Sequence, residues 1–296
     1  MFSADVEADA KEVGESMNTI LGMFPTIILP FSEYLEKLPL PMIIRYHKAR
    51  ETLDGIIFGL IENRRKEAAQ YGDLLSMLMA ARDHEGDGTG MTDRQVRDEA
   101  ITLFLAGHET TANALTWTWY LLSQHPEVEA KVHAEIDEVL SGRLPQFEDF
   151  PRLKYIESVM AESMRLYPPV WTIGRQAKTE FELDGYTVPA KSVILTSPYV
   201  VHRSKRFWPR PEQFDPGRWS IEGHRHKFTY FPFGGGPRLC IGERFAWMEG
   251  VLLIATIAQS WRFKLVPGHP VDPLPLITLR PRHGMKMTLE SRLTPC

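Results

Sequence analysis

The chain has 296 residues, and its 34 lysine and arginine residues against 38 aspartate and glutamate residues give a formal net charge of −4. Hydrophobic residues make up 43% and charged residues 24%, ordinary values that exclude fibrous and fully disordered classes. The charge balance gives no basic footprint for nucleic acid. The two cysteines, Cys240 and Cys296, are too few for a disulfide framework or a multi-cysteine zinc site, and they fit a reducing compartment.

The apolar runs of the chain are too short to cross a bilayer. The longest, Ile56–Ile61 and Val251–Ala258, fall well below the roughly 20 residues that a membrane-spanning helix needs. The N-terminus is acidic and lacks the basic flank and apolar core of a signal peptide. We therefore expect a soluble, cytoplasmic protein with no membrane span in this chain.

The first part of the chain is predicted to be helical. Apolar residues recur at helical spacing over 4–22 and over 42–69, and 73–82 predicts a short apolar helix. Proline punctuates residues 24–41, and glycine with aspartate dominates 83–90, so both segments are expected to be loops. No internal repeat is evident.

Residues 93–124 predict one very long helix. Thr92 followed by Gln95 is the pattern of a capping box, which satisfies the free N–H groups at a helix start. Pro126 marks the far end and is placed to open the next helix, over 126–140. At 1.5 Å per residue the long helix would measure roughly 48 Å, enough to cross a whole domain.

The second part of the chain mixes helices with short strands. A helix is expected over 153–166, where Pro168 and Pro169 follow, and another over 243–261. A hairpin is expected around Asp184-Gly185, a favoured two-residue turn. Two more strands are expected at 276–281 and 286–291. The predicted fold class is therefore mainly α with a small β portion, in a single domain over 1–296.

The segment 233–242, FGGGPRLCIG, places one cysteine at the start of a helix after a glycine-rich turn. Backbone N–H groups and the helix dipole there favour a thiolate over a thiol. Gly236 and Gly242 carry no Cβ and would let a large flat ligand approach, and Arg238 could pair with an anionic group on it. A buried structural cysteine is the alternative. However, the full pattern F-x-x-G-x-R-x-C-x-G arises by chance in fewer than roughly one in ten thousand chains of this size.

This segment resembles the haem-binding loop of the cytochrome P450 family. The resemblance implies that Cys240 is the thiolate ligand of the iron of a haem b. Such a ligand pushes electron density onto the iron and favours O–O cleavage. It also implies that Phe233, Gly234, Arg238 and Gly242 take part in binding the haem.

A second segment, AGHETT at 106–111, lies in the middle of the predicted long helix. A glycine and threonine hydroxyls inside an apolar helix weaken its hydrogen bonds and can open a kink or a groove for water. Glu109 and Thr110 form an acid–alcohol pair suited to proton transfer, although a solvated Glu and threonines bonded to their own helix would look the same. By resemblance the motif lies over the haem. Gly107 would then contact the cofactor, while Thr110 and Glu109 would be catalytic and deliver protons to dioxygen.

A third pair, Glu162 and Arg165, lies three residues apart on one face of a predicted helix. Taken alone, such a pair is usually a surface ion pair worth a few tenths of a kcal/mol. The resemblance implies the E-x-x-R motif of the family, with Arg218 in the segment FDPGRW as third member. We expect this network to be structural and to hold the Cys240 loop in register.

Further expectations concern the propionates and the substrate. By resemblance Arg175 pairs with a haem propionate, and a surface arginine is the alternative. Apolar residues near Leu103–Ala106, Val170–Ile173 and Pro275–Ile277 would face an apolar small-molecule substrate. The ten histidines show neither an H-E-x-x-H pattern nor paired-cysteine spacing, so another type of metal site is poorly supported.

The family's members are typically well over a hundred residues longer, and the difference falls at the N-terminus. If 4–22 and 42–69 correspond to the helices that roof the substrate pocket, everything before that roof is absent. The expected fold is therefore an N-terminally truncated cytochrome P450 catalytic domain. Whether this chain alone is active is left open.

The resemblance implies a haem-thiolate monooxygenase that inserts one atom of O2 into an apolar substrate. Electrons would come from a separate ferredoxin, flavodoxin-type protein or reductase, and we expect the chain itself to be a monomer. The electron donor would dock on the Cys240 side by charge complementarity. The basic residues expected there are Arg203, Lys205, Arg206, Arg225 and Lys227. A peroxide-using or isomerising relative and a haem-binding remnant without turnover are the alternatives, and the retained Glu109-Thr110 pair argues against the first.

Overall fold

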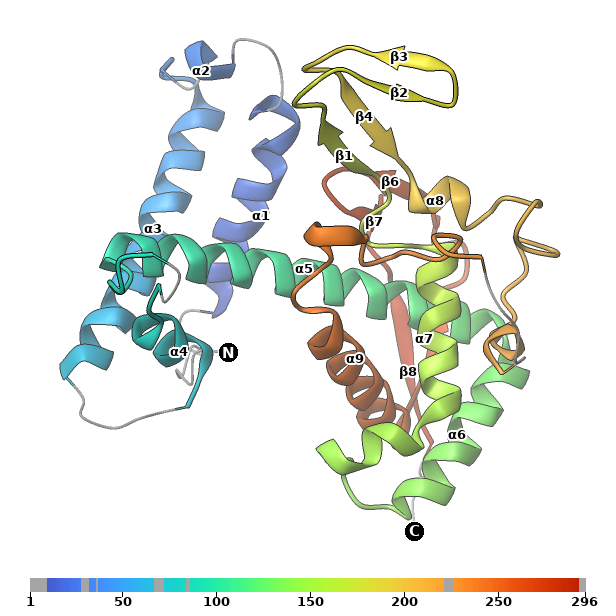
Figure 1. The fold of residues 1–296 in the computed structure, drawn as a ribbon. Helices are drawn as coiled ribbons and strands as arrows, with labels where there is room; N and C mark the ends of the chain where they lie inside the picture. The colour runs from blue at the N-terminus through green and yellow to red at the C-terminus, as the bar shows by residue number, and fades with distance from the viewer. Residues whose placement is uncertain are drawn as a thin grey trace. The chain divides into compact units, whose positions relative to one another are not determined.

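The computed structural model describes residues 10–27, 32–35, 37–66, 72–83, 86–220 and 226–292. The chain divides into two compact units, Met1–His108 and Glu109–Cys296. Helices dominate the described residues, and the strands form small two-stranded sheets (Figure 1), which confirms the expected fold class. Residues 4–9 of the first predicted helix and Cys296 lie outside the described part of the chain.

The described part of the first unit is mainly helical. Its helices are α1 (Ala10–Ile27), α2 (Ser32–Leu35), α3 (Pro41–Lys66), α4 (Leu74–Ala80) and the first half of α5 (Asp93–Gln124). Helices α1 and α3 run side by side (Figure 1) and bury Val13 and Met17 against Leu53. Ile101 and Phe104 of α5 pack on the same cluster. The amphipathic pattern of these helices is therefore used to build this small core.

The proline-rich segment 24–41, predicted to be a loop, contains helical residues. Helix α1 continues to Ile27, and α2 forms within the segment. Pro25 lies in the last turn of α1, where a missing N–H removes one backbone hydrogen bond and leaves the helix behind it intact. The next helix, α4, begins one residue later than predicted, because Asp73 is its N-cap and accepts a hydrogen bond of 2.9 Å from the backbone N–H of Ser76.

The long helix α5 has the predicted bounds. The backbone N–H of Thr92 donates to Gln95 Oε1 at 2.9 Å, and that of Gln95 donates to Thr92 Oγ1 at 3.3 Å, so the capping box is formed. Pro126 is the first residue of the next helix, α6 (Pro126–Leu140), as predicted. The described helices include none that is both long and apolar enough to cross a membrane.

The core of the second unit lies among α6, α7 (Lys154–Leu166) and α9 (Glu243–Ala258), which are grouped in Figure 1. The shared buried side chains include Val132, Ile156, Val159, Val251 and Ile254. Gly250 allows α9 to approach α7, because a Cβ on it would lie 2.4 Å from Cε of Met160. Short helical turns connect the larger elements: η1 (Phe147–Arg152), α8 (Pro198–Val201), η2 (Pro216–Trp219) and η3 (Gly236–Arg238).

Eight strands of the second unit's described residues pair antiparallel in twos. The pairs are β1 (Ile173–Gln176) with β4 (Val193–Thr196), β2 (Phe181–Leu183) with β3 (Tyr186–Val188), β5 (Trp261–Leu265) with β8 (Met287–Ser291), and β6 (Pro273–Pro275) with β7 (Leu279–Pro281). The hairpin turn at Asp184 (φ 50°) and Gly185 (φ 82°) is left-handed at both positions, as a type I′ turn requires. The hairpin and the strand at 286–291 are thus confirmed. In the segment 276–281 only β7 forms, and the helix predicted to reach residue 261 ends at Ala258 because β5 follows it.

Candidate functional site

The Cys240 loop connects η3 to α9 and presents a free thiol. Cys240 is exposed and lies three residues before the first residue of α9. Its backbone N–H donates to the carbonyl of Phe233 at 3.1 Å, which closes the loop, and the Phe233 ring packs against Trp247 with centroids 5.8 Å apart. Gly234 (φ 77°) and Gly236 (φ 71°) adopt the left-handed conformation that the turn needs and that glycine adopts without strain. The loop thus holds the thiol at a helix N-terminus, where the dipole favours an anion.

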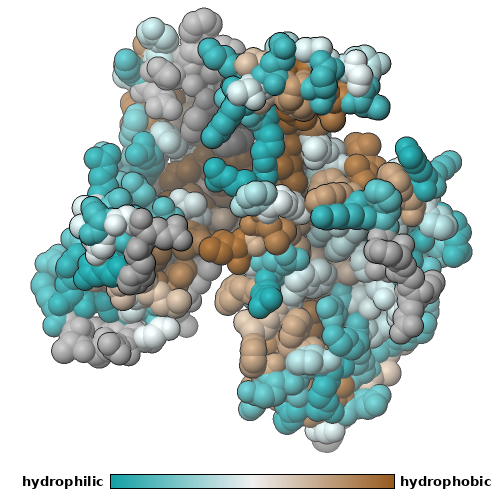
Figure 2. Space-filling model, in the orientation of Figure 1, coloured by the Kyte–Doolittle hydropathy of each residue, from teal (hydrophilic) through white to brown (hydrophobic). Residues whose placement is uncertain are grey.

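The two residues that flank Cys240 in the chain have apolar side chains that are exposed to solvent. Ile241 is 91% exposed and Leu239 50% exposed. Figure 2 shows apolar surface over the loop that leads into α9. A Cβ on Gly242 would lie 3.9 Å from Cys240 Sγ, so a glycine there leaves the sulfur open to approach. A thiol amid exposed apolar surface fits a large, flat, apolar ligand with a metal at its centre, and haem has this chemistry.

Two arginines, Arg238 in the loop and Arg175 on β1, could bind anionic groups of a ligand. Arg238 is exposed, and its guanidinium forms no ion pair or hydrogen bond with another described residue. Arg175 lies on β1 and donates to the carbonyl of its neighbour Gly174 at 2.8 Å. A Cβ on Gly234 would lie 3.6 Å from Ile173 Cδ1, which shows that the loop approaches the start of β1. Both guanidinium groups therefore remain available for carboxylates of a ligand.

Glu109 is the most strongly engaged residue of the acid–alcohol motif. Its Oε1 accepts hydrogen bonds from Arg280 Nε, from Thr278 Oγ1 and from Asn113 Nδ2, the last at 3.4 Å. Burial raises the pKa of Glu109, but the hydrogen bonds from Arg280 and Thr278 and the positive charge of Arg280 outweigh it, so the pKa lies below its ordinary value. The carboxylate is therefore held ionised at neutral pH.

The other motif residues lie on α5 as expected. Gly107 and the half-buried Thr110 flank Glu109 in an unbroken helix, so the described backbone continues through the motif. The partners Arg280 and Thr278 were not among the residues predicted from the sequence, since they lie 171 and 169 positions away. Asn113 follows Glu109 by four residues on one helix face, a spacing that could have identified it.

The structure brings Glu162, Arg165 and Arg218 together in a buried network. Arg165 Nε and Nη2 each donate to the Glu162 carboxylate at 2.9 Å, and Arg218 Nε donates to it at 3.1 Å. Both Glu162 and Arg165 side chains are 0% exposed. Two further donors were not predicted, the indole of Trp219 at 3.0 Å and the backbone N–H of Asp215 at 3.0 Å. Because Arg218 and Trp219 of η2 both donate to Glu162 of α7, the network ties this turn to that helix.

Two of the predicted substrate-facing segments are hydrogen-bonded to one another. The indole Nε1 of Trp171 donates to the carbonyl of Leu276 at 2.7 Å, and the backbone N–H of Leu279 donates to the carbonyl of Pro169 at 2.8 Å. Ser197 Oγ donates to the carbonyl of Trp171 at 2.6 Å and fixes the same stretch from the other side. These hydrogen bonds therefore join residues 170–173 to residues 275–277.

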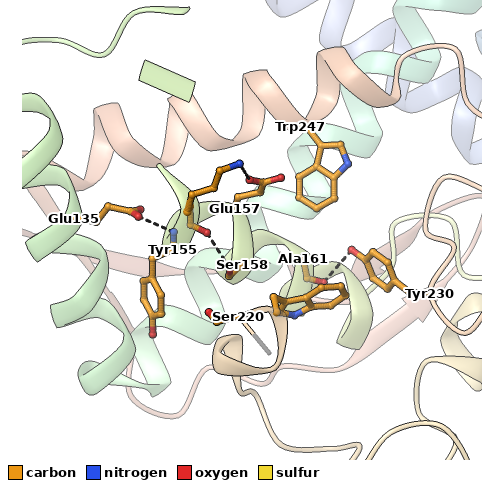
Figure 3. A pocket seen from close by; sticks show the side chains of 10 residues that line it. Glu135, Tyr155, Glu157, Ser158, Ala161, Ser220, Tyr230 and Trp247 are labelled. Carbon is orange, nitrogen blue, oxygen red and sulfur yellow. Dashed lines mark hydrogen bonds and ion pairs between the residues drawn. The ribbon is translucent and has the colours of Figure 1, made fainter. Parts of the chain in front are cut away.

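A pocket of about 670 Å³ lies among α6, α7, α9 and the turn after η2 (Figure 3). Glu135 accepts from the backbone N–H of Tyr155 at 2.7 Å, and Tyr230 donates to the carbonyl of Ala161 at 3.1 Å. These polar groups already bind within the protein, and no predicted site residue lines the pocket. In the described residues there is also no cluster of three or more His, Cys, Asp or Glu side chains that could hold a bare metal ion.

Known proteins define the class of this fold and site. The family model described as Cytochrome P450 matches residues 2–288. Cyclooctatin synthase of Streptomyces melanosporofaciens is 44% identical over 94% of this chain and 61% of its own length. Pentalenene oxygenase of Streptomyces avermitilis is 36% identical over 99% of this chain and 65% of its own length. The solved structure of retinoic acid-bound cyanobacterial CYP120A1 superposes with a TM-score of 0.84 at 28% identity, covering 94% of this chain and 63% of that one.

The chain belongs to the cytochrome P450 family. It spans 43–65% of the length of the curated relatives compared with it. Membership of this family implies a haem with thiolate-ligated iron. The donor set at the Cys240 loop fits that cofactor.

Proposed function

We propose that the chain is the catalytic part of a cytochrome P450 monooxygenase. It would insert one oxygen atom of O2 into an apolar organic molecule, with electrons from a separate redox protein. The observation that carries this proposal is the free, exposed Cys240 thiol, presented by a glycine-rich loop at the start of α9 amid apolar side chains. Since the family match runs from residue 2 to 288, we propose that both units belong to one catalytic domain and that it acts as a monomer.

The chain's own residues would bind and orient the haem. Cys240 Sγ would ligate the iron, and Phe233 with its partner Trp247 would keep water from the sulfur. Arg238 and Arg175 would pair with the propionates, because neither is engaged by a carboxylate of a described residue. When bound, the haem supplies the reductive activation of O2 and the transfer of one oxygen atom to a C–H bond.

Protons would reach the reaction through α5. Glu109 is held ionised, so it can accept a proton and release it, as a general acid–base residue must. Thr110 follows it directly, and its hydroxyl can receive one proton while passing on another. Gly107, two residues before Glu109, would leave room beside the helix for the cofactor.

The hydrogen-bonded segments 170–173 and 275–277 support an apolar substrate. Trp171 and Leu276 join these segments by their hydrogen bond and leave mainly apolar side chains to contact a ligand. Two relatives are named for cyclic hydrocarbon-derived compounds, as pentalenene oxygenase and cyclooctat-9-en-7-ol 5-monooxygenase. We propose a cyclic terpenoid hydrocarbon as the substrate class.

An acidic redox protein would serve as electron donor. Of the basic residues predicted to receive it, Lys205, Arg206 and Lys227 are exposed. Arg203 donates to Glu212 at 3.2 Å and lies 3.8 Å above the Tyr199 ring, so its charge is partly used within the protein. Arg225 lies outside the described residues. The exposed cations favour fast, salt-sensitive association.

Turnover with labelled oxygen tests the proposal. The haem-loaded chain, a ferredoxin with its reductase, NADPH and ¹⁸O2 are incubated with pentalenene and with a panel of cyclic terpenes. Product that carries one ¹⁸O atom, and its absence with the Cys240→Ala variant, is the expected result. Haem-loaded chain that yields no oxygenated product with any member of the panel would contradict the proposed activity.

A further inference from the structure

The two oxygens of the Glu109 carboxylate have very different surroundings. Oε1 receives hydrogen bonds from Arg280, Thr278 and Asn113. Asn113 Nδ2 also donates to Thr278 Oγ1 at 3.1 Å, which joins the donors into one cluster. Oε2 is buried and has no hydrogen-bond partner. The hydrogen-bonding capacity of Oε1 is thus filled, whereas Oε2 can still accept a proton.

The unpaired Oε2 lowers the stability of the fold, which suggests that it is retained for function. A buried polar atom without a partner costs about 1–3 kcal/mol, and native structures keep few of them. An oxygen that already accepts three donors has no lone pair left for a proton. Because Arg280 and Thr278 come from the segment around β7 while Asn113 comes from α5, the carboxylate is held from two elements and cannot exchange its oxygens by rotation without breaking these bonds.

We propose that Arg280 is a positioning residue for proton transfer: together with Thr278 it anchors Oε1 of Glu109, so that Oε2 alone takes up and releases the proton passed to Thr110. The inference deepens the proposed function and rests on it. In the transfer, Oε2 accepts a proton from a hydronium ion, which leaves as water, and forms an O–H bond. That bond breaks when the proton moves to the Thr110 hydroxyl oxygen, while the proton of that hydroxyl passes to an oxygen of the O2 that the proposed reaction reduces, and Glu109 returns to the ionised form.

The electrostatics agree with this geometry. Arg280 is the charged side chain that contacts Glu109 among the described residues, and the other contacts, Thr278 and Asn113, are neutral. The Arg280 side chain is 26% exposed and the Glu109 side chain 10%, so the anchor is more exposed to solvent than the carboxylate that it holds. Loss of the guanidinium would leave burial as the dominant effect and would raise the pKa of Glu109.

The test compares Arg280→Met with Arg280→Lys and Thr278→Val, with Arg282→Met as the matched control. Arg282 is an exposed arginine two residues further along the same segment. Difference infrared spectroscopy across a pH titration follows the protonated carboxyl of Glu109, assigned by its loss in Glu109→Gln. This readout requires only the folded protein. Product formed per NADPH consumed and the solvent isotope effect on turnover are measured in parallel.

Arg280→Met is expected to move the titration of Glu109 to higher pH and to lower coupled product formation roughly ten- to hundredfold, the usual cost of misplacing a reacting group. Arg280→Lys should restore most of both, Thr278→Val should give an intermediate change, and Arg282→Met should give none. An unchanged Glu109 titration and unchanged coupling in Arg280→Met would overturn the inference, as would equal losses in Arg282→Met. If the unmodified chain does not turn over, the proposed function fails while the infrared titration still decides whether Arg280 anchors Glu109.

Discussion

The buried network around Glu162 gives the sharpest prediction on stability. The Glu162→Gln substitution keeps the shape of the side chain but removes the negative charge that faces Arg165 and Arg218. Arg165 is fully buried and cannot be solvated in place, although the carbonyls of His202 and Pro211 still accept from it. Removing one partner of such a buried pair costs about 3–5 kcal/mol. A typical domain has about 5–15 kcal/mol in total, so this is a large fraction of it.

Thermal and urea unfolding of the purified protein measure this cost. For a unit of this size, a loss of 3–5 kcal/mol corresponds to a fall in Tm of roughly 6–20 °C. The Glu157→Gln variant is the matched control on the same helix. It removes an ion pair with Lys154 whose side chains are 35% and 68% exposed, and it should cost under about 1 kcal/mol. If Glu162→Gln and Glu157→Gln unfold at the same temperature, the network does not stabilise the fold as argued.

Two further predictions concern the core and acid stability. Gly250→Ala would place a Cβ 2.4 Å from the end of the buried Met160 side chain and should cost about 1–3 kcal/mol in thermal unfolding. Burial, and then the charge of Arg165, lowers the pKa of His202 to about 3, so the unfolded chain binds this proton more readily than the folded one. Stability should therefore fall as pH drops below about 6.5, by up to about 1.4 kcal/mol per pH unit, and this slope should be smaller in His202→Gln. A Gly250→Ala variant as stable as the parent, or an identical acid slope in His202→Gln, would count against the packing and the titration described here.

Local sequence signals correctly predicted the elements whose ends contain capping or turn-forming residues. The long helix α5 had the predicted bounds because Thr92 and Gln95 cap its start and Pro126 begins the next helix. The hairpin at Asp184-Gly185 formed for the same reason, since the turn itself dictates the pairing. Where the end of an element depends on tertiary packing, as at the end of α1 beyond Pro25, the sequence pattern alone was wrong.

Site residues far apart in the chain were harder to predict. Glu162 and Arg165 are visible as a pair because they share one helix face, but Arg218 was predicted from family resemblance alone. Nothing in the periodicity of α5 pointed to Arg280 as the partner of Glu109, because contacts across 171 residues leave no trace in local spacing. The Cys240 loop was recognisable because its glycines, arginine and cysteine must all lie within ten residues.

The haem-thiolate bond at Cys240 is the central claim, and one spectrum tests it most directly. The chain is expressed with haem precursor, reduced with dithionite and exposed to carbon monoxide, and its Soret band is recorded beside that of Cys240→His. The account predicts a red-shifted, thiolate-type band for the chain and its loss in the variant. The same band in both proteins, or a histidine-type band in the unmodified chain that binds haem, would contradict it.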